Sequence, residues 1–159
     1  MDPKALYFDK DKLNRFFPFY ILIGDGLKIS SCGGTIKKLS GNCEGEYFKN
    51  HFQVTKPVIE TVDFKSLQLI TGQLTTIEIN NQQKSILKGQ FEFLEKNNQL
   101  LFIGSPWFNS IAQLTASKLT LNDFAVHDPL IDLLYVFKMQ EDVNEDLKGL
   151  VQTINNQKK

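Results

Sequence analysis

Few side chains in this sequence are of the types that carry out chemistry. The 159 residues include two histidines, His51 and His127, and two cysteines, Cys32 and Cys43. His127 precedes Asp128, a pair that occurs in metal-dependent phosphohydrolases, but such a site needs further His and Asp ligands. A Ser-His-Asp or Cys-His arrangement has no better support. We therefore expect no catalytic residue and no metal site in this chain.

Three other features have both a functional and a structural interpretation. His51 is a candidate haem ligand, yet no second feature of a haem pocket accompanies it, which favours a surface or partly packed histidine. Cys32 and Cys43 form no CxxC pair, so structural thiols, reduced in a cytosol, are favoured over an oxidation sensor. Gly24-Asp25-Gly26 lies between predicted strands with no following helix or Lys-Ser/Thr, which excludes a phosphate loop. We predict no cofactor.

Composition excludes several further classes. The chain balances 18 basic against 18 acidic residues and has no basic patch interleaved with aromatics, so we expect no nucleic-acid partner. The longest apolar run, residues 16–23, is interrupted by Pro18 and is too short to span a bilayer. The charged N-terminus lacks the apolar core of a signal peptide. These features predict a cytoplasmic protein that does not bind membranes.

The elements that would position these side chains follow a simple order. Asp9 or Asp11 caps a short helix that ends before Pro18, and the turn Asp25-Gly26 predicts a hairpin. Short helical patterns follow, and then three strands. We expect strands at 19–23, 27–31, 73–79, 86–94 and 100–104, with helical patterns at 35–39 and within 46–70. This is an α+β fold, a PAS-like five-stranded antiparallel sheet with short helices on one face.

The most informative segment is a long amphipathic helix that follows a polar joint. Apolar residues recur in steps of three, four or seven, as in a heptad repeat, with Gln140 at one of the repeat positions. They are Leu133, Val136, Val143, Leu147, Leu150 and Ile154. So narrow a stripe predicts that the helix pairs with a second copy of the chain. Leu13 and Phe16, on the N-terminal helix, are expected to extend this dimer interface.

The same stripe has a simpler interpretation, which is packing against the chain's own sheet. In residues 130–137 the apolar side chains cover more than one face and fit that interpretation. Beyond Met139 only the stripe remains, flanked by charges, and there a two-chain coiled coil is favoured. Gly149 weakens such a helix by roughly 1 kcal/mol relative to Ala. The helical pattern reaches the last residues without a stop signal, so we expect the chain to be part of a longer protein.

Two further groups of residues are candidate functional sites. Asp123, His127 and Asp128 form a candidate signalling joint, in which Asp128 caps the exit helix and Asp123 ties the joint to the sheet.

Gln90, Phe91 and Phe93 are candidate pocket residues next to Gly89, which marks a bend or a close backbone approach. Trp107 and Phe108 either cover an edge of the core or belong to an interface.

Four stretches of this sequence match a known family. FFPFYILIGDGLKISSCGGTIKKL, GEYFKNHFQVTKPVI, ILKGQFEFLEKNNQLLFIGSPWF and LTLNDFAVHDPLIDLL resemble, in this order, the haem-NO-binding-associated (H-NOXA) domain. This PAS-like domain occurs in soluble guanylate cyclases and bacterial sensor histidine kinases. One position departs from the family, because Tyr20 stands where a histidine is common.

The resemblance implies a regulatory domain, usually without its own haem, that dimerises and couples a sensor to a catalytic output. The expected partners are a second copy, a sensor such as a haem-NO/O2-binding domain, and a downstream histidine kinase or cyclase. An alternative is a PAS domain that senses a small molecule in an apolar pocket. The expected organisation is an N-terminal helical cap at 1–17, the PAS-like domain at 18–127 and a signalling helix at 128–159.

Overall fold

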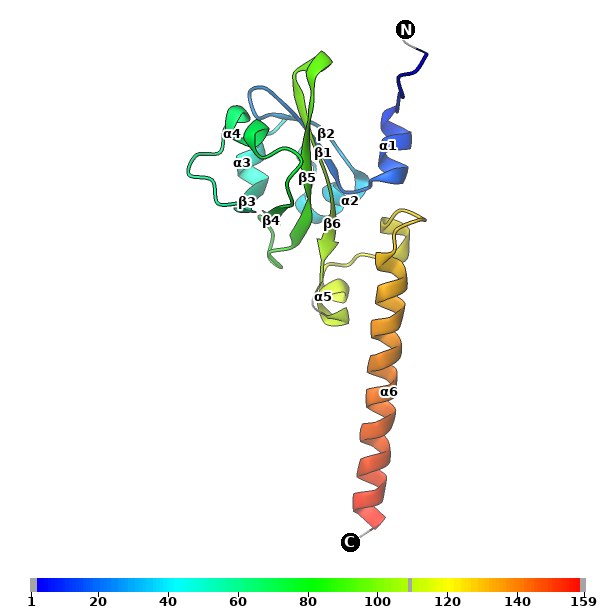
Figure 1. The fold of residues 1–159 in the computed structure, drawn as a ribbon. Helices are drawn as coiled ribbons and strands as arrows, with labels where there is room; N and C mark the ends of the chain where they lie inside the picture. Colours follow the sequence, from blue (N-terminus) through cyan, green and yellow to red (C-terminus); the bar gives the residue numbers. More distant parts are fainter. Residues whose placement is uncertain (1–2, 109, 158–159) are drawn as a thin grey trace.

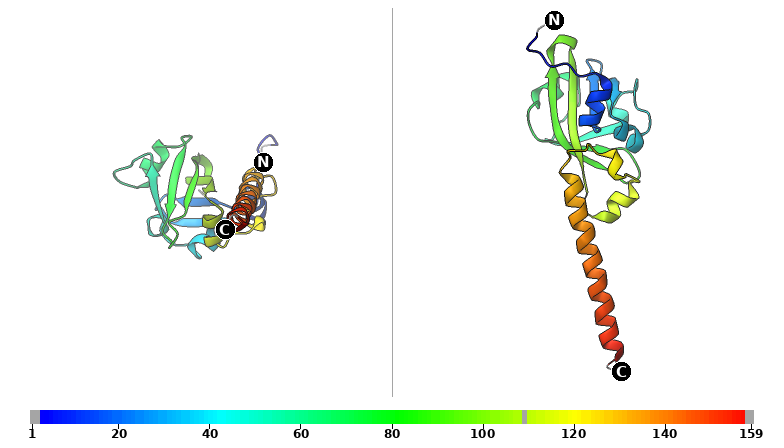
Figure 2. Two further views of the ribbon diagram at one scale, coloured as in Figure 1. Left: turned by 90° about the horizontal axis from the view of Figure 1, so that it is seen from below. Right: turned by 90° about the vertical axis from the view of Figure 1, so that its right-hand side faces the viewer.

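One long helix projects from a six-stranded antiparallel sheet (Figure 1). The computed structural model describes residues 3–108 and 110–157. The ends of the predicted cap and signalling helix, residues 1–2 and 158–159, lie outside the described residues. Figure 2 shows that most of this long helix extends away from the domain, whereas the N-terminal helix lies beside the sheet.

The sheet has the strand order β2-β1-β6-β5-β4-β3. Its strands are β1 (Tyr20–Gly24), β2 (Ile29–Cys32), β3 (Phe52–Lys56), β4 (Thr75–Ile79), β5 (Ile86–Leu94) and β6 (Gln99–Trp107). The two longest, β5 and β6, lie at the centre, with Phe91 opposite Phe102. The α+β class and the antiparallel sheet are confirmed, whereas the expected strand number was one too few.

The strand absent from the prediction is β3, an edge strand within the segment that we expected to be helical. Phe52 and Val54 alternate with Gln53 and Thr55, and Phe52 pairs with Ile79 of β4. The alternation spans too few residues to stand out between two real helices, α3 (Phe48–His51) and α4 (Phe64–Leu69). Pairing with β4, which brings both apolar side chains into the core, decides the strand.

Strand β6 is also longer than expected, since it continues through Pro106 to Trp107. A proline inside a central strand would normally remove a ladder hydrogen bond. Strand β1, however, pairs with β6 only from Gln99 to Ile103, so β6 has a single neighbour at Pro106. The last residues of β6 therefore behave as an edge strand, where proline is tolerated.

The two faces of the sheet differ in what covers them. The core face carries Ile21, Ile23, Phe91 and Phe102, all without exposed surface. Helices α2 (Gly34–Ser40), α3 and α4 cover it, each burying a side chain in the core. The other face, called the outer face below, carries alternate residues of the same strands. They are Leu22, Lys88, Gln90, Glu92, Leu101, Ile103 and Ser105.

The remaining helices lie along the outer side and the exit. Helix α1 (Lys10–Phe16) begins at Asp9, whose side chain accepts a hydrogen bond from the Lys12 backbone N–H at 2.8 Å. Helix α5 (Ile111–Ala116) was not predicted. The 3-10 turns η1 (Glu95–Asn97) and η2 (Leu121–Asp123) complete the chain before α6 (Leu130–Gln157). Figure 1 shows α1 and the start of α6 on the opposite side of the sheet from α3 and α4.

Gly89 lies where the backbones of the two central strands, β5 and β6, come close together. It lies opposite Gly104, and a Cβ atom built on it would be 2.0 Å from the carbonyl oxygen of Ile103. No side chain fits that space without separating β5 from β6. Of the two roles that the sequence left open for Gly89, a bend or a close backbone approach, the structure shows the close approach.

Candidate functional site: the exit helix, its joint and the outer-face cleft

Helix α6 is the longest element of the described structure, and most of its surface is exposed to solvent. Its 28 residues extend for about 42 Å at 1.5 Å per residue. Leu134 is its one buried residue. Leu130, Ile131 and Phe137 are partly buried against the core, so the first two turns pack on the chain's own domain. From Lys138 to the last described residue every side chain is exposed.

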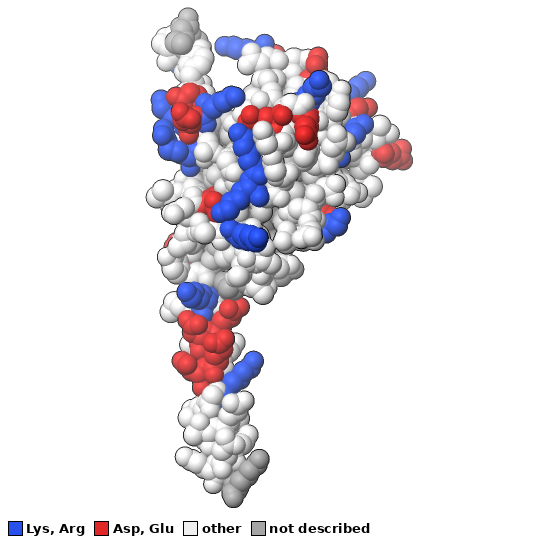
Figure 3. Space-filling view, turned by 180° about the vertical axis from the view of Figure 1, so that it is seen from behind, with Lys and Arg blue, Asp and Glu red and all other residues white. Residues whose placement is uncertain are grey.

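The heptad stripe on α6 forms a continuous exposed line, which we call the seam. It comprises Leu133, Val136, Gln140, Val143, Leu147, Leu150 and Ile154. Its apolar members have 43–57% of their surface exposed. The acidic residues Glu141, Asp142, Glu145 and Asp146 lie off the seam, and acidic side chains gather on the upper part of the helix in Figure 3. The helix is thus amphipathic, and its own domain does not cover the apolar stripe.

The joint that leads into α6 is fastened to α2. The side chain of Lys38 donates a hydrogen bond to Oδ2 of Asp123 at 2.7 Å, and the Thr35 hydroxyl donates to the Asp123 carbonyl oxygen at 2.6 Å. The Thr120 backbone N–H also donates to Oδ2 of Asp123, at 2.7 Å. We call these contacts the clasp. It joins residues 85 and 88 positions apart, so sequence spacing gave no sign of Thr35 or Lys38.

The environment of Asp123 favours its charged form. Partial burial raises the pKa of the carboxyl group, but the hydrogen bonds from Lys38 and from the Thr120 backbone outweigh it. The pKa of Asp123 therefore lies below its usual value. The sequence placed Asp123 in the joint and expected it to tie the joint to the sheet, whereas its hydrogen bonds go to helix α2 and to Thr120 within the joint.

The other two joint residues lie next to the start of α6. Oδ1 of Asp128 accepts a hydrogen bond from the Leu130 backbone N–H at 2.9 Å, which makes Asp128 the predicted cap. The Pro129 carbonyl accepts from the Leu133 N–H at 3.2 Å, so the helical hydrogen bonds begin there. His127 is exposed, and its ring centroid lies 6.3 Å from that of Phe16.

The two N-terminal interface candidates lie on α1, above the start of α6. Leu13 is half-buried, whereas Phe16 is exposed and touches both Phe8 and His127. The structure therefore brings Phe16 to the joint. Figure 1 shows α1 near the upper end of the molecule and the C-terminal part of α6 at the lower end, so α1 lies far from the end of the seam.

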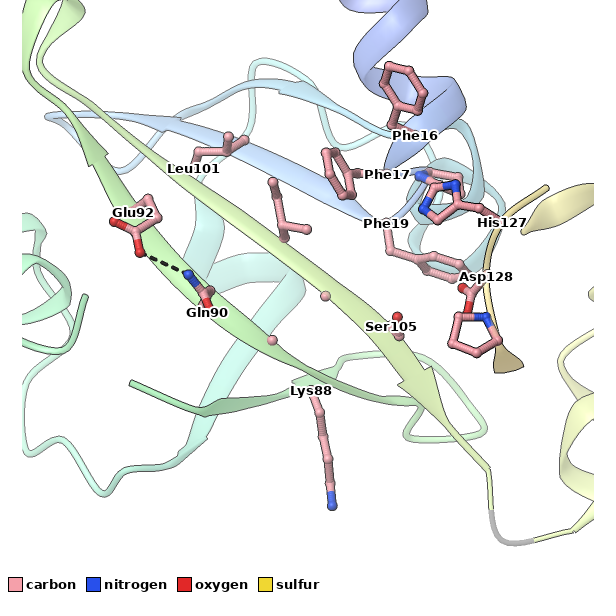
Figure 4. A pocket seen from close by; sticks show the side chains of 15 residues that line it. Phe16, Phe17, Phe19, Lys88, Gln90, Glu92, Leu101, Ser105, His127 and Asp128 are labelled. Carbon is pink, nitrogen blue, oxygen red and sulfur yellow. Dashed lines mark hydrogen bonds between the residues drawn. The ribbon is translucent and has the colours of Figure 1, made fainter. Parts of the chain in front are cut away.

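A cleft of about 420 Å³ opens on the outer face between α1, the strands β5 and β6, and the joint. Phe16, Phe17, Leu101 and Ile103 supply apolar walls. Polar groups come from Lys88, Gln90, Glu92, Ser105, His127 and Asp128. Figure 4 shows the Gln90 amide directed at Glu92, to which it donates a hydrogen bond at 2.8 Å.

The three candidate pocket residues of β5 do not meet at one cavity, because successive side chains of a strand point to opposite faces. Gln90 lines the outer-face cleft. Phe91 is fully buried, with ring centroids 5.1 Å from Phe102 and 6.2 Å from Phe48. Phe93 packs against Phe64 at 6.1 Å. Phe91 and Phe93 thus pack among other aromatic side chains on the helical side of the sheet.

Both ring nitrogens of His51 are engaged with neighbouring side chains. Nδ1 lies 2.9 Å from the Ser40 hydroxyl, and Nε2 pairs with Glu46. This places His51 in a local polar network, in agreement with the partly packed histidine that the sequence favoured. Tyr20, at the position where the family often has histidine, is buried and hydrogen-bonded to the Ser31 hydroxyl.

The side chains of Trp107 and Phe108 lie in different environments. Phe108 packs against the core. Trp107 is half exposed on the outer side of β6, with the Lys88 ammonium 3.9 Å from the ring centroid. Phe108 therefore helps to cover the core, and an interface role for Trp107 stays a prediction.

No three His, Cys, Asp or Glu side chains in residues 3–108 and 110–157 gather as a metal site requires. Over the same residues, none of the helices has the length and apolar character needed to cross a membrane.

The combination of an antiparallel α+β domain, a joint fastened to α2 and an exposed heptad helix is typical of a regulatory module. Comparison with known proteins agrees. The family model described as "Heme NO binding associated" matches residues 6–86 and 73–157, which together cover nearly the whole chain. The chain therefore belongs to the haem-NO-binding-associated family.

Its relatives include guanylate cyclases from several animals. It is 23% identical over 131 residues to guanylate cyclase soluble subunit alpha-1 of Canis lupus familiaris, covering 76% of this chain and 19% of the relative. Identity is 27% over 142 residues to the beta-2 subunit of Rattus norvegicus, covering 83% and 21%. It is 24% over 133 residues to the head-specific guanylate cyclase of Drosophila melanogaster, covering 77% and 20%.

The chain thus spans about a fifth of the length of these relatives. Membership of the family makes it a sensor or regulatory domain of a signalling protein.

Proposed function

We propose that this domain dimerises through the seam of α6 and relays a signal from a partner sensor to an output domain. The observation that carries the proposal is the seam itself. Six apolar side chains at heptad spacing stand about half exposed on a helix that leaves the domain. A second helix packed along the seam would cover them by knobs-into-holes packing.

The polar member of the seam supports pairing in a defined register. Gln140 lies between Val136 and Val143 and is the only uncharged polar residue among the seven. A polar side chain at one core position of a coiled coil selects register at a cost in stability, since a shifted pairing leaves it against apolar neighbours. A parallel, in-register pair would set Gln140 against Gln140 of the second copy.

The relay would operate through the joint. The clasp between Asp123 and α2 holds the segment that leads into α6, and Asp128 begins the helix five residues later. An input that strengthens or weakens the clasp would favour one of two packings of the paired helices. The signal would then pass along α6 as a change in packing.

The nature of the output follows from the relatives' names. All of the relatives described above are named guanylate cyclases, so a nucleotide cyclase is the output that we propose, ahead of a histidine kinase. The sensor would be a separate domain or protein, such as a haem-NO/O2-binding one. A cytoplasmic setting belongs to the same proposal, supported by the word "soluble" in the relatives' names.

Light scattering coupled to size exclusion tests the dimer. We would compare the whole chain, a chain truncated after Phe137, and the whole chain carrying Val143→Glu and Leu147→Glu. Tyr135→Glu is the matched control, because Tyr135 is equally exposed but faces away from the seam. A dimer that is lost in the truncated and seam variants and kept in the control is expected. A whole chain that stays monomeric at high concentration would refute seam pairing.

A second candidate function, ligand sensing, is favoured by the cleft on the outer face. A small molecule bound there would touch α1, the sheet and the joint at once, so binding could bias the clasp. Native mass spectrometry of the purified chain, compared with an Ile103→Trp variant that fills the cleft, tests it. A co-purified molecule that the variant lacks would support sensing, whereas the same molecule on both proteins would count against this site.

A further inference from the structure

The fold brings the two cysteines together. Cys32 ends β2, and Cys43 lies in the loop after α2, yet their sulfur atoms are 3.2 Å apart. Both side chains are buried and neither forms a disulfide. Their separation of 11 residues resembles no redox motif, which is why the sequence favoured plain structural thiols.

The pair brackets the helix that holds the exit joint. Cys32 precedes α2 and Cys43 follows it, so a disulfide between them would close a covalent ring of chain that includes the whole helix. Thr35 and Lys38, the two α2 residues of the clasp, lie inside that ring. The ion pair between Lys37 and Glu44, at 3.0 Å, ties the same loop to the same helix.

We propose that Cys32 and Cys43 are a peroxide-sensitive dithiol whose disulfide fixes α2 and thereby the clasp on the exit joint. The thiol chemistry stands on the sulfur–sulfur geometry alone. The regulatory consequence rests on the proposed function, because it requires that the clasp controls α6.

The reaction balances with a peroxide as oxidant. The Cys43 thiolate attacks one peroxide oxygen, forming an S–O bond as the O–O bond breaks, and the departing oxygen leaves as water. Cys32 sulfur then attacks the resulting sulfenic acid, forming the S–S bond while the S–O bond breaks and a second water leaves. The two thiols are oxidised by two electrons, and the peroxide is reduced to two waters.

The environment supports this order of events. The hydrogen-bond contact between the two sulfur atoms lowers the pKa of Cys43, while the same contact and burial raise the pKa of Cys32. Cys43 therefore forms the reactive thiolate more readily than Cys32 does. Its loop runs between Gly41 and Gly45, both at positive φ, and the residues beside Gly41 are not buried, so a small oxidant needs only a local opening.

Peroxide treatment of the whole chain, followed by mass spectrometry, tests the bond. The expected product has lost the mass of two hydrogens, and its digest contains one peptide pair joined through Cys32 and Cys43, which a reductant separates. A product that keeps both thiols, or one that gains oxygen or cross-links between chains instead, would overturn the proposal. The wild-type protein suffices for this test, so no variant has to fold.

Two matched variants test the order of attack. Dimedone traps sulfenic acids, so after peroxide Cys32→Ser should be labelled at Cys43, where the resolving thiol is gone. Cys43→Ser should be labelled far less at Cys32. Equal labelling of the two variants would overturn the assignment of Cys43 as the attacking thiol.

Hydrogen exchange tests whether the disulfide fixes α2, separately from whether α6 relays a signal. In the oxidised chain the amides of α2 should exchange more slowly than in the reduced chain, and unchanged exchange there would overturn the locking role. Molar mass by light scattering is measured on the same samples. A monomer in both redox states would count against the seam proposal only, since the disulfide and the α2 exchange do not depend on dimerisation.

Discussion

Leu147→Ala offers a quantitative test of the seam. Leu147 lies in the middle of the freely exposed part of α6 and has 53% of its surface exposed in the single chain. Full burial of a leucine side chain is worth about 1.5–3 kcal/mol, so covering the exposed half is worth about 1 kcal/mol per chain. The dimer contains two copies, and losing both side chains should weaken it by about 2 kcal/mol.

That loss corresponds to a dimer dissociation constant raised about 30-fold, since each 1.4 kcal/mol is a factor of ten. Sedimentation equilibrium over a dilution series measures it directly. Tyr135→Ala is the matched control, because Tyr135 is 52% exposed on the same helix but points away from the seam. Circular dichroism of both variants would show that the fold is retained.

Two results would refute the reasoning. A dissociation constant for Leu147→Ala within about threefold of wild type would mean that less than 1 kcal/mol comes from covering this side chain. An equal weakening by Tyr135→Ala would mean that the helices meet along another face, and that the heptad stripe does not define the contact.

Three further predictions concern the domain itself. Gly89→Ala should destabilise the domain by more than about 2 kcal/mol, because the added Cβ would meet the backbone of the opposite strand. Gly149→Ala should stabilise α6 by about 1 kcal/mol, because the added Cβ meets open space. Equal effects of the two substitutions in chemical denaturation would contradict this. Tyr20→Phe leaves the buried Ser31 hydroxyl unpaired and should lower the free energy of unfolding by about 1–3 kcal/mol, so an unchanged urea midpoint would speak against that hydrogen bond. Because the pKa of Asp123 is lowered in the folded state, the charged carboxylate stabilises the fold fully above about pH 4, and this stabilisation is lost as the pH falls through the lowered pKa. Asp123→Ala should therefore make the free energy of unfolding less dependent on pH on the acid side. An unaltered pH dependence would refute the clasp.

Local signals predicted much of the fold because each depends on neighbouring residues. The Asp25-Gly26 turn set the first hairpin, the alternation in residues 86–94 set β5 with its observed bounds, and Asp9 and Asp128 capped the helices that follow them. Strand β3 was missed because its alternation is short and its helical neighbours dominate the local pattern. Only pairing with β4 makes that segment extended.

The candidate site likewise has features that the sequence predicted and features that only the structure shows. The seam is a periodic property of one helix, so the amino-acid sequence alone determined its members and its narrowness. The sequence could not tell whether the helix packs on its own sheet, because that depends on the direction in which the chain leaves the domain. The structure resolves this: packing ends at Phe137, and the helix beyond it is exposed.

What the sequence determined by itself is therefore what neighbouring residues fix: the turns, the caps, the central strands, the heptad stripe and the family motifs. Tertiary structure alone decided the contacts between distant segments. Lys38 meets Asp123 across 85 positions, and the sulfur atoms of Cys32 and Cys43 come together from the two ends of a whole helix. No local pattern encodes such contacts, because they arise only when burial of the shared core sets the separate elements side by side.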